Sequence, residues 1–216
     1  MENERNAQAA AQAAEEKKPV EEKKPGYPMH KRKYTPLYTI IVFLYGLLVK
    51  LLFFMKIEGR ENVPKDRNCI LMGNHQCLLD PVTLALCVPD REIHFMGKKE
   101  LFENKALGWV FRQVHGFPVD RGKGDVAAVQ AAGRVLQQDE TLAIFPEGKR
   151  NKRKGRDWSL LEFQNGATLI ALRNESPVLP ICFVDRPRMF HRTRIVVGKP
   201  IDLREWMDPA LSRAEN

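Results

Sequence analysis

The chain has 216 residues, a length typical of one domain, and its 35 Lys and Arg against 27 Asp and Glu give a formal charge of +8. Hydrophobic residues make up 44% of it, which excludes a chain disordered throughout, and a mean hydropathy of −0.38 excludes a protein with many membrane spans. A pI near 9.4 favours anionic partners, namely nucleic acid, a membrane surface or a phosphorylated substrate.

The basic residues are clustered along the chain. Residues 149–157 hold six bases and one acid, and residues 185–205 hold six bases and three acids. Outside these segments and the first 33 residues the sequence is close to neutral, which indicates a globular domain with local basic patches. No recognised nucleic-acid motif and no interleaved aromatic residues surround these patches, so we expect no nucleic-acid partner.

The cysteines give no sign of a metal site. Cys69, Cys77, Cys87 and Cys182 lack the paired C-x-x-C spacing of zinc ribbons. We expect no bound metal, and buried free thiols in a reducing compartment.

The N-terminal part divides into a tail and an apolar segment. Residues 1–33 are rich in Ala and Gln and repeat the sequence EEKKP, which predicts a disordered tail and not a signal peptide. Residues 37–55 form an apolar run that as a helix would be about 28 Å long. A buried core helix is the alternative, but apolar residues occur on nearly every face. We therefore predict a membrane-associated helix over residues 34–57.

The remainder, residues 58–216, alternates strand-length apolar runs with helical patterns. This alternation predicts an α/β domain with a central, mostly parallel sheet covered by helices on both faces. The predicted helices occupy residues 81–88, 104–114, 125–138 and 160–173. The predicted strands occupy residues 69–72, 93–96, 117–119, 142–145, 178–183 and 195–197.

His75 and Asp80 lie five residues apart in NHQCLLD, between a predicted strand and a helix that starts with Pro81. His115 and Asp120 share this spacing. Positions five apart on one helix point about 140° apart, so such a pair needs a turn that folds the histidine back over the first helical residues. Spacing alone leaves two interpretations of the first pair open: a catalytic His–Asp pair, or a solvated histidine beside an N-capping aspartate.

Two more polar segments follow predicted strands. Arg121 lies in the glycine-rich turn GFPVDRGKG, where its guanidinium suits a phosphate group, although an ordinary exposed turn is the alternative. Glu147 lies in FPEGKR, at the end of the strand predicted over residues 142–145. Because ligands of open α/β sheets bind beyond the carboxyl ends of strands, we expect His75, Arg121 and Glu147 to converge on one crevice.

These segments resemble the glycerophospholipid acyltransferase family, and most of all its 1-acyl-glycerol-3-phosphate (lysophosphatidate) acyltransferase branch. NHQCLLD is similar to the family's H-x4-D box, and GFPVDR is similar to its second block. FPEGKR is similar to the third block, with Lys149 where Thr or Ser is usual, and VLPI at residues 178–181 is similar to the fourth. The four blocks occur in order over residues 58–200, and the resemblance selects His75 over His115.

The resemblance implies transfer of a fatty acyl group from an acyl thioester, either acyl-CoA or acyl-carrier protein, to the free hydroxyl of 1-acyl-glycerol-3-phosphate, giving phosphatidic acid. His75 would act as general base and Asp80 would fix its tautomer, with no acyl-enzyme and no metal or tightly bound cofactor. Acylation of glycerol-3-phosphate or of another lysophospholipid is the alternative. Acceptor binding is implied for four residues: Arg121, Glu147, Gly148 and Arg150.

The implied lipid substrates require a membrane surface, and the implied donor is cytosolic. A single span that begins with a cytosolic basic N-terminus would place His75 on the side opposite the donor. We therefore expect the domain on the cytoplasmic face of a membrane, held there by a peripheral or monotopic attachment or by a single-helix anchor, with residues 31–33 against anionic headgroups.

Overall fold

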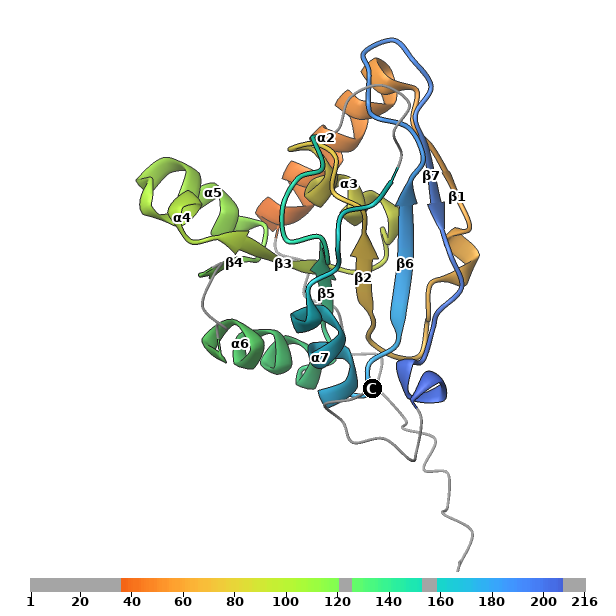
Figure 1. Cartoon of the computed structure of the whole chain (residues 1–216). Helices are drawn as coiled ribbons and strands as arrows, with labels where there is room; N and C mark the ends of the chain where they lie inside the picture. The colour runs from red at the N-terminus through yellow and green to blue at the C-terminus, as the bar shows by residue number, and fades with distance from the viewer. Residues whose placement is uncertain (1–35, 121–125, 153–158, 208–216) are drawn as a thin grey trace, which may run out of the picture. The chain divides into compact units, whose positions relative to one another are not determined.

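Seven strands of the described residues form one sheet, in the spatial order β1-β7-β6-β2-β5-β3-β4 (Figure 1). The computed structural model describes residues 36–120, 126–152 and 159–207, so the predicted tail lies outside the described residues. All neighbouring strands are parallel except β6 and β7, which confirms the predicted mostly parallel sheet. The strands are β1 (Lys56–Glu58), β2 (Ile70–Gly73), β3 (Ile93–Lys98), β4 (Gly116–Val119), β5 (Thr141–Ile144), β6 (Val178–Phe183) and β7 (Arg194–Val197).

Helices cover both faces of the sheet, as the buried apolar runs require. Successive residues of a strand point to opposite faces, so Leu71 packs in the cluster that contains Leu84 of α3, while Ile70 packs in the cluster that contains Ala132 of α6 and Ile170 of α7. The helices are α2 (Pro36–Phe53), α3 (Asp80–Cys87), α4 (Glu100–Glu103), α5 (Lys105–Gln113), α6 (Val126–Gln137) and α7 (Asn165–Arg173), with short 3₁₀ turns η1 (Arg60–Asn62) and η2 (Leu203–Trp206).

The predicted elements differ from the observed ones at several places. The helix predicted over residues 34–57 ends at Phe53, and residues 56–58 form β1. The helix predicted over residues 160–173 begins at Asn165, because residues 159–164 form a loop that wraps the end of β5. In that loop the Leu161 N–H donates to Glu147 Oε2 at 3.0 Å, and the Gln164 N–H donates to Pro146 O at 2.8 Å. The short elements β1 and α4 have no distinct apolar pattern and were not predicted.

Helix α2 packs against the domain along one stripe and exposes another. Tyr38 and Val49 are buried in the domain, and the Tyr45 hydroxyl lies 2.7 Å from Thr83 Oγ1 of α3. Only 11% of α2 is buried, so the alternative of a core helix is wrong. Within the described part of the chain it is the one helix long and apolar enough to cross a membrane. The exposed stripe consists of Ile40, Phe43, Leu44, Leu47, Leu48 and Leu51.

Gly59 joins β1 to η1 in a conformation that a side chain disfavours. Its φ is +81°, and a Cβ at this position would lie 2.1 Å from the carbonyl oxygen of Val197. We expect Gly59→Ala to lower the free energy of unfolding by about 2 kcal/mol, because alanine must adopt a left-handed φ and push a neighbouring strand aside. A denaturant titration in detergent, followed by circular dichroism, measures this change.

The matched control is Gly166→Ala in α7, where a Cβ meets nothing within 4 Å. This variant should be as stable as the unaltered chain or slightly more stable, because alanine favours the helix. Equal stability of the two alanine variants would contradict the role assigned to Gly59.

Candidate active site

The three central strands β6, β2 and β5 carry the site at their carboxyl ends. β2 lies between β6 and β5 and is parallel to both, so the loops that follow the three strands meet at one edge of the sheet. His75 lies two residues beyond β2, and Glu147 lies three residues beyond β5. The His75 backbone N–H donates to Glu147 Oε1 at 2.8 Å, so the structure brings these two predicted site residues into direct contact.

The side chains of His75 and Asp80 form a hydrogen-bonded pair. His75 Nδ1 lies 2.9 Å from Asp80 Oδ2, and the same oxygen accepts from the backbone N–H groups of Gln76 at 2.6 Å and Cys77 at 2.7 Å. The turn therefore folds back over the start of α3, as the five-residue spacing requires. The alternative of an N-capping aspartate is wrong, because Asp80 is the first residue of α3 and its carboxylate accepts from the residues that precede the helix.

Cys77 provides a further donor to this carboxylate. Its Sγ lies 2.9 Å from Asp80 Oδ1. Burial and the neighbouring negative charge of Asp80 raise the pKa of the Cys77 thiol to about 12, so the thiol stays protonated at neutral pH and donates. The prediction of buried free thiols holds for Cys69 and Cys87, whereas Cys77 is half-buried and Cys182, in β6, is exposed.

The imidazole of His75 is held on its faces as well as at Nδ1. It stacks on Phe145 with ring centroids 4.2 Å apart, and 12% of the side chain is exposed. The alternative interpretation also predicted that His75 would be solvated, and this part of it is therefore wrong as well. Within the described residues Nε2 has no hydrogen-bond partner, so this nitrogen is available to a substrate proton.

Polar residues on either side of His75 attach its turn to β6. The Asn74 side chain donates to the carbonyl oxygen of Phe183 at 3.1 Å and accepts from its N–H at 2.8 Å, which continues the β2–β6 pairing beyond the end of β2. Gln76 Nε2 donates to the same carbonyl at 3.0 Å. The sequence showed both residues to be polar but gave no sign of these contacts, because Phe183 lies 109 residues from Asn74.

Asn151 and Arg186 complete the support of His75, and sequence reasoning missed both. The Asn151 N–H donates to the His75 carbonyl at 2.6 Å, and Asn151 is 7% exposed. Arg186, which follows β6, donates from Nη2 to the Asn151 carbonyl at 3.1 Å. The loops after β2, β5 and β6 are therefore linked in one hydrogen-bonded chain.

Glu147 lies beneath the loops that surround His75. It is 2% exposed, and its two oxygens accept from the N–H groups of His75 and Leu161. The next residue, Gly148, has a φ of +66° and turns the chain back through a bond from its N–H to the carbonyl of Phe145, at 3.0 Å. These contacts make Glu147 a positioning residue for the turn that carries His75, in addition to the predicted role in acceptor binding.

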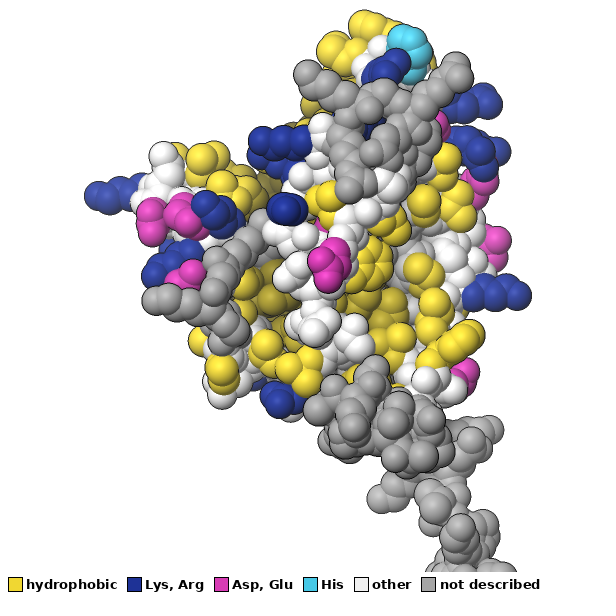
Figure 2. Space-filling view, viewed as in Figure 1, with side chains coloured by type: hydrophobic (Ala, Val, Ile, Leu, Met, Phe, Trp, Pro, Cys, Tyr) yellow, Lys and Arg dark blue, Asp and Glu magenta, His cyan; other side chains and the backbone are white. Residues whose placement is uncertain are grey.

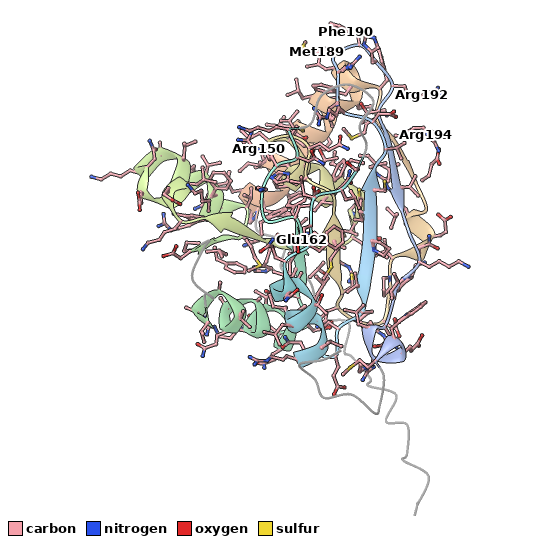
Figure 3. All side chains as sticks on the ribbon, viewed as in Figure 1. Arg150, Glu162, Met189, Phe190, Arg192 and Arg194 are labelled. Atoms are coloured by element: carbon pink, nitrogen blue, oxygen red, sulfur yellow. The ribbon has the colours of Figure 1, made fainter. Side chains whose placement is uncertain are left out.

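The predicted basic residues lie at the rim of the site or outside the described residues. Arg150 is exposed in the loop after β5, where Figure 3 labels it. Arg121 lies outside the described residues. The preceding residue, Asp120, follows β4, which is three strands from β2 in the sheet and therefore roughly 14 Å away at the usual strand spacing.

The second pair with the same spacing, His115 and Asp120, does not come together. The two residues flank β4 at its opposite ends. His115 Nε2 lies 2.7 Å from Glu92 Oε2, and its ring stacks against those of Tyr38 and His94. Spacing alone did not distinguish the two pairs, and the structure places only His75 beside its aspartate. Among the described residues, no group of three or more His, Cys, Asp and Glu side chains is arranged to hold a metal ion.

The buried carboxylate of Glu147 gives a test of this arrangement. We expect Glu147→Gln to lower the free energy of unfolding by about 1–3 kcal/mol, because an amide N–H₂ would face a backbone N–H and leave a buried donor unsatisfied. The measurement is a denaturant titration in detergent. Glu162→Gln, an exposed position in the neighbouring loop, should change the stability by less than about 0.5 kcal/mol. A Glu147→Gln protein as stable as this control would refute the proposed positioning role.

Several known proteins are similar to this chain in sequence. The chain is 28% identical to a 1-acyl-sn-glycerol-3-phosphate acyltransferase of Bacillus subtilis, over 68% of this chain and 73% of that protein. It is 32% identical to the protein of that name from Haemophilus influenzae, over 73% of this chain and 65% of the relative. It is 30% identical to the one from Streptococcus pneumoniae, over 74% of this chain and 62% of the relative. The alignment thus spans less than two thirds of the last two proteins.

The fold is shared with a solved structure, the crystal structure of the 1-acyl-sn-glycerophosphate (LPA) acyltransferase PlsC from Thermotoga maritima. The TM-score is 0.55 at 22% identity, with 79% of this chain and 89% of that chain covered. A family model described as Acyltransferase matches residues 54–184. Since this match includes the His75–Asp80 pair and more than half of the sequence, the chain belongs to the acyltransferase family.

Proposed function

We propose that this O-acyltransferase transfers a fatty acyl group from an acyl thioester to the free hydroxyl of 1-acyl-glycerol-3-phosphate, giving phosphatidic acid. The observation that carries the proposal is the His75–Asp80 pair, with Nδ1 bound to a buried carboxylate and Nε2 left for a substrate. The names of the relatives from three bacteria support the acceptor. The thioester carrier is coenzyme A or acyl-carrier protein.

The chemistry follows from the state of the imidazole. An alcohol is a poor nucleophile at neutral pH, so a base must accept its proton as it attacks. Asp80 holds the proton on Nδ1, so Nε2 accepts the hydroxyl proton while the hydroxyl oxygen bonds to the thioester carbonyl carbon. The tetrahedral intermediate then collapses, the C–S bond breaks, and the imidazolium returns the proton to the leaving thiolate. The substrate hydroxyl takes the place of an enzyme nucleophile, and no acyl-enzyme forms.

The phosphate of the acceptor requires positive charge at the rim of the site. Arg150 is exposed in the loop that contains Glu147, and Arg121 has the side chain suited to a bidentate contact with phosphate. Glu147 and Gly148 shape the loop between His75 and this rim. In this proposal the acceptor lies with its phosphate toward the arginines and its free hydroxyl at Nε2.

The attachment to the membrane is proposed to be monotopic, on the cytoplasmic face. Helix α2 touches the domain near its start through Tyr38, at its middle through Tyr45 and near its end through Val49. A helix packed along its length against a polar domain lies beside that domain and cannot cross the bilayer alone. Its exposed apolar stripe then lies in the interface, where the lipid acceptor is found.

The direct test incubates the purified protein in mixed micelles with lysophosphatidate and a labelled acyl-CoA. We expect labelled phosphatidic acid from the unaltered chain and none above background from His75→Ala. Glycerol-3-phosphate and lysophosphatidylcholine, offered separately, test the acceptor. Preferred acylation of either one would overturn the proposed substrate, and a stable acyl-protein adduct during turnover would overturn direct transfer.

Asp80→Asn removes the negative charge of the carboxylate but keeps the size and shape of the side chain, so it tests whether the charge is needed for catalysis. Asparagine retains an oxygen for the N–H groups of Gln76 and Cys77, so we expect the fold to persist. The rate should fall about 10³–10⁴-fold, because the imidazolium loses its counter-charge and the wrong tautomer is favoured. The measurement is kcat with saturating substrates, beside a circular dichroism spectrum. A rate near that of the unaltered chain would exclude a catalytic role for Asp80.

Arg121→Lys tests the acceptor phosphate. We expect the KM for lysophosphatidate to rise about tenfold with the KM for acyl-CoA unchanged, because a bidentate fork is replaced by a point charge. Arg134→Lys, an exposed position on α6, is the control and should leave both constants unchanged. Equal effects of Arg121→Lys on both substrates would assign Arg121 to another role.

A further inference from the structure

The loop between β6 and β7, residues 184–193, presents apolar side chains at its tip. Met189 is 53% exposed and Phe190 is 66% exposed. Figure 3 labels both at the top of the view, and in Figure 2 hydrophobic, basic and histidine side chains gather there. Because β2, β5 and β6 are parallel, this loop leaves the same edge of the sheet as the loops that carry His75 and Glu147.

The tip of this β6–β7 loop is fastened to the end of α2. The N–H of Phe190 donates to the carbonyl of Leu52 at 2.5 Å, and the N–H of Thr193 donates to the carbonyl of Phe53 at 3.2 Å. The last carbonyl groups of a helix have no partner within the helix, so the loop satisfies two of them. The exposed end of α2 and the loop tip therefore form one continuous surface.

The backbone at this junction is held in an unfavourable conformation. Phe190 has a φ of +61°, and Phe54, at the end of α2, has a φ of +40°. Both are non-glycine residues in the left-handed region, and both expose more than half of their side chains. A strained backbone that directs large apolar side chains into water costs stability twice, which indicates a surface built for contact with something apolar.

The charges around the tip narrow the nature of that contact. Residues 186–192, RPRMFHR, contain three arginines and one histidine and no acidic residue. Arg186 binds the carbonyl of Asn151, whereas Arg188 and Arg192 are exposed and have no acidic partner within the described part of the chain. Apolar side chains between free arginines match the boundary between acyl chains and anionic headgroups.

We propose that the β6–β7 loop is a second membrane-contacting element, which inserts Met189 and Phe190 into the interface of an anionic phospholipid bilayer. Arg188 and Arg192 bind the lipid phosphates. The exposed stripe of α2 continues into this tip, which favours a bilayer over a soluble acidic partner. The inference rests on membrane association of α2 but not on the proposed reaction, and its tests do not measure acyl transfer.

The first test uses tryptophan quenching by brominated lipids. In two test proteins all three native tryptophans, Trp109, Trp158 and Trp206, are replaced by Phe. A single tryptophan is then introduced by Phe190→Trp in one protein and by Phe43→Trp, on α2, in the other. The control protein retains Trp206 alone, which is 79% exposed and follows β7 at the opposite edge of the sheet (Figure 1). The proteins are reconstituted into vesicles of phosphatidylcholine and phosphatidylglycerol, and circular dichroism checks each fold.

We expect the Phe190→Trp protein to be quenched as strongly as the Phe43→Trp protein, with the Trp206 emission unchanged. Quenching of the Phe43→Trp protein alone would overturn the inference and leave the attachment by α2 standing. Absence of quenching at both positions would overturn the loop contact and the attachment by α2 alike. A change in oligomeric state in detergent on Met189→Ser with Phe190→Ser would identify a second copy as the occupant, which also overturns the inference.

The second test measures how much Arg188 and Arg192 contribute to vesicle binding, in a chain without other substitutions. Co-sedimentation with the same vesicles should show a loss of affinity of about fivefold for each of Arg188→Gln and Arg192→Gln, and about 30-fold for the pair. With pure phosphatidylcholine vesicles the variants should match the unaltered chain. Arg134→Gln with Arg173→Gln, exposed positions on α6 and α7, is the matched control and should bind normally. Equal losses for both pairs would refute a specific contact by the loop.

Discussion

Four hydrogen-bond donors converge on the carboxylate of Asp80, which is fully buried at the first turn of α3. A buried charge is costly unless it is hydrogen-bonded, so the turn between β2 and α3 folds in the way that brings two backbone N–H groups, a thiol and an imidazole to this one group. The orientation of His75 thus follows from the need to hydrogen-bond the buried carboxylate of Asp80. The same contacts fix which ring nitrogen carries the proton, which is the property that the proposed general-base mechanism requires.

The main chain of His75 is held as firmly as its side chain. Its N–H donates to Glu147 and its carbonyl accepts from Asn151, so both of its backbone groups are bound to the loop after β5. Arg186 binds that loop from the other side. The sheet order explains the arrangement, because β2 lies between β5 and β6 and the loops after its two neighbours enclose the loop that it carries.

The sequence predicts those parts of the structure that depend on local patterns of apolar residues, namely the strands and helices. The six predicted strands lie within two residues of observed ones, since each is a run of apolar residues, with buried residues in all but β4, and the His75–Asp80 turn follows from helical geometry. Contacts between segments that are distant in the sequence leave no such local pattern. The loop at residues 159–164 contains Leu160 and Leu161, typical of a helix, yet its backbone donors serve Glu147 and Pro146.

The same limit explains why Asn74 and Asn151 were not identified as part of the site. Each is an ordinary polar residue in the sequence, and each derives its role from backbone groups far away in the sequence, Asn74 from Phe183 in β6 and Asn151 from His75 in the loop after β2. The choice between His75 and His115 shows the limit most clearly. Both histidines precede an aspartate by five residues, and only the pairing of β4 within the sheet separates His115 from Asp120.

The packing of α2 connects this site to the apolar surface that we propose as the membrane contact. The Tyr45 hydroxyl donates to the carbonyl of Leu79 and lies 2.7 Å from Thr83 Oγ1, so α2 is joined to the turn of α3 that contains Asp80. The exposed stripe of α2 faces away from these contacts, and the β6–β7 loop is bonded to the end of the helix. A bilayer that contacts both elements therefore lies against the edge of the domain from which His75 projects. In the proposed function, a lysophospholipid in that orientation brings its glycerol hydroxyl to Nε2 without its acyl chain leaving the lipid, which avoids the cost of exposing that chain to water.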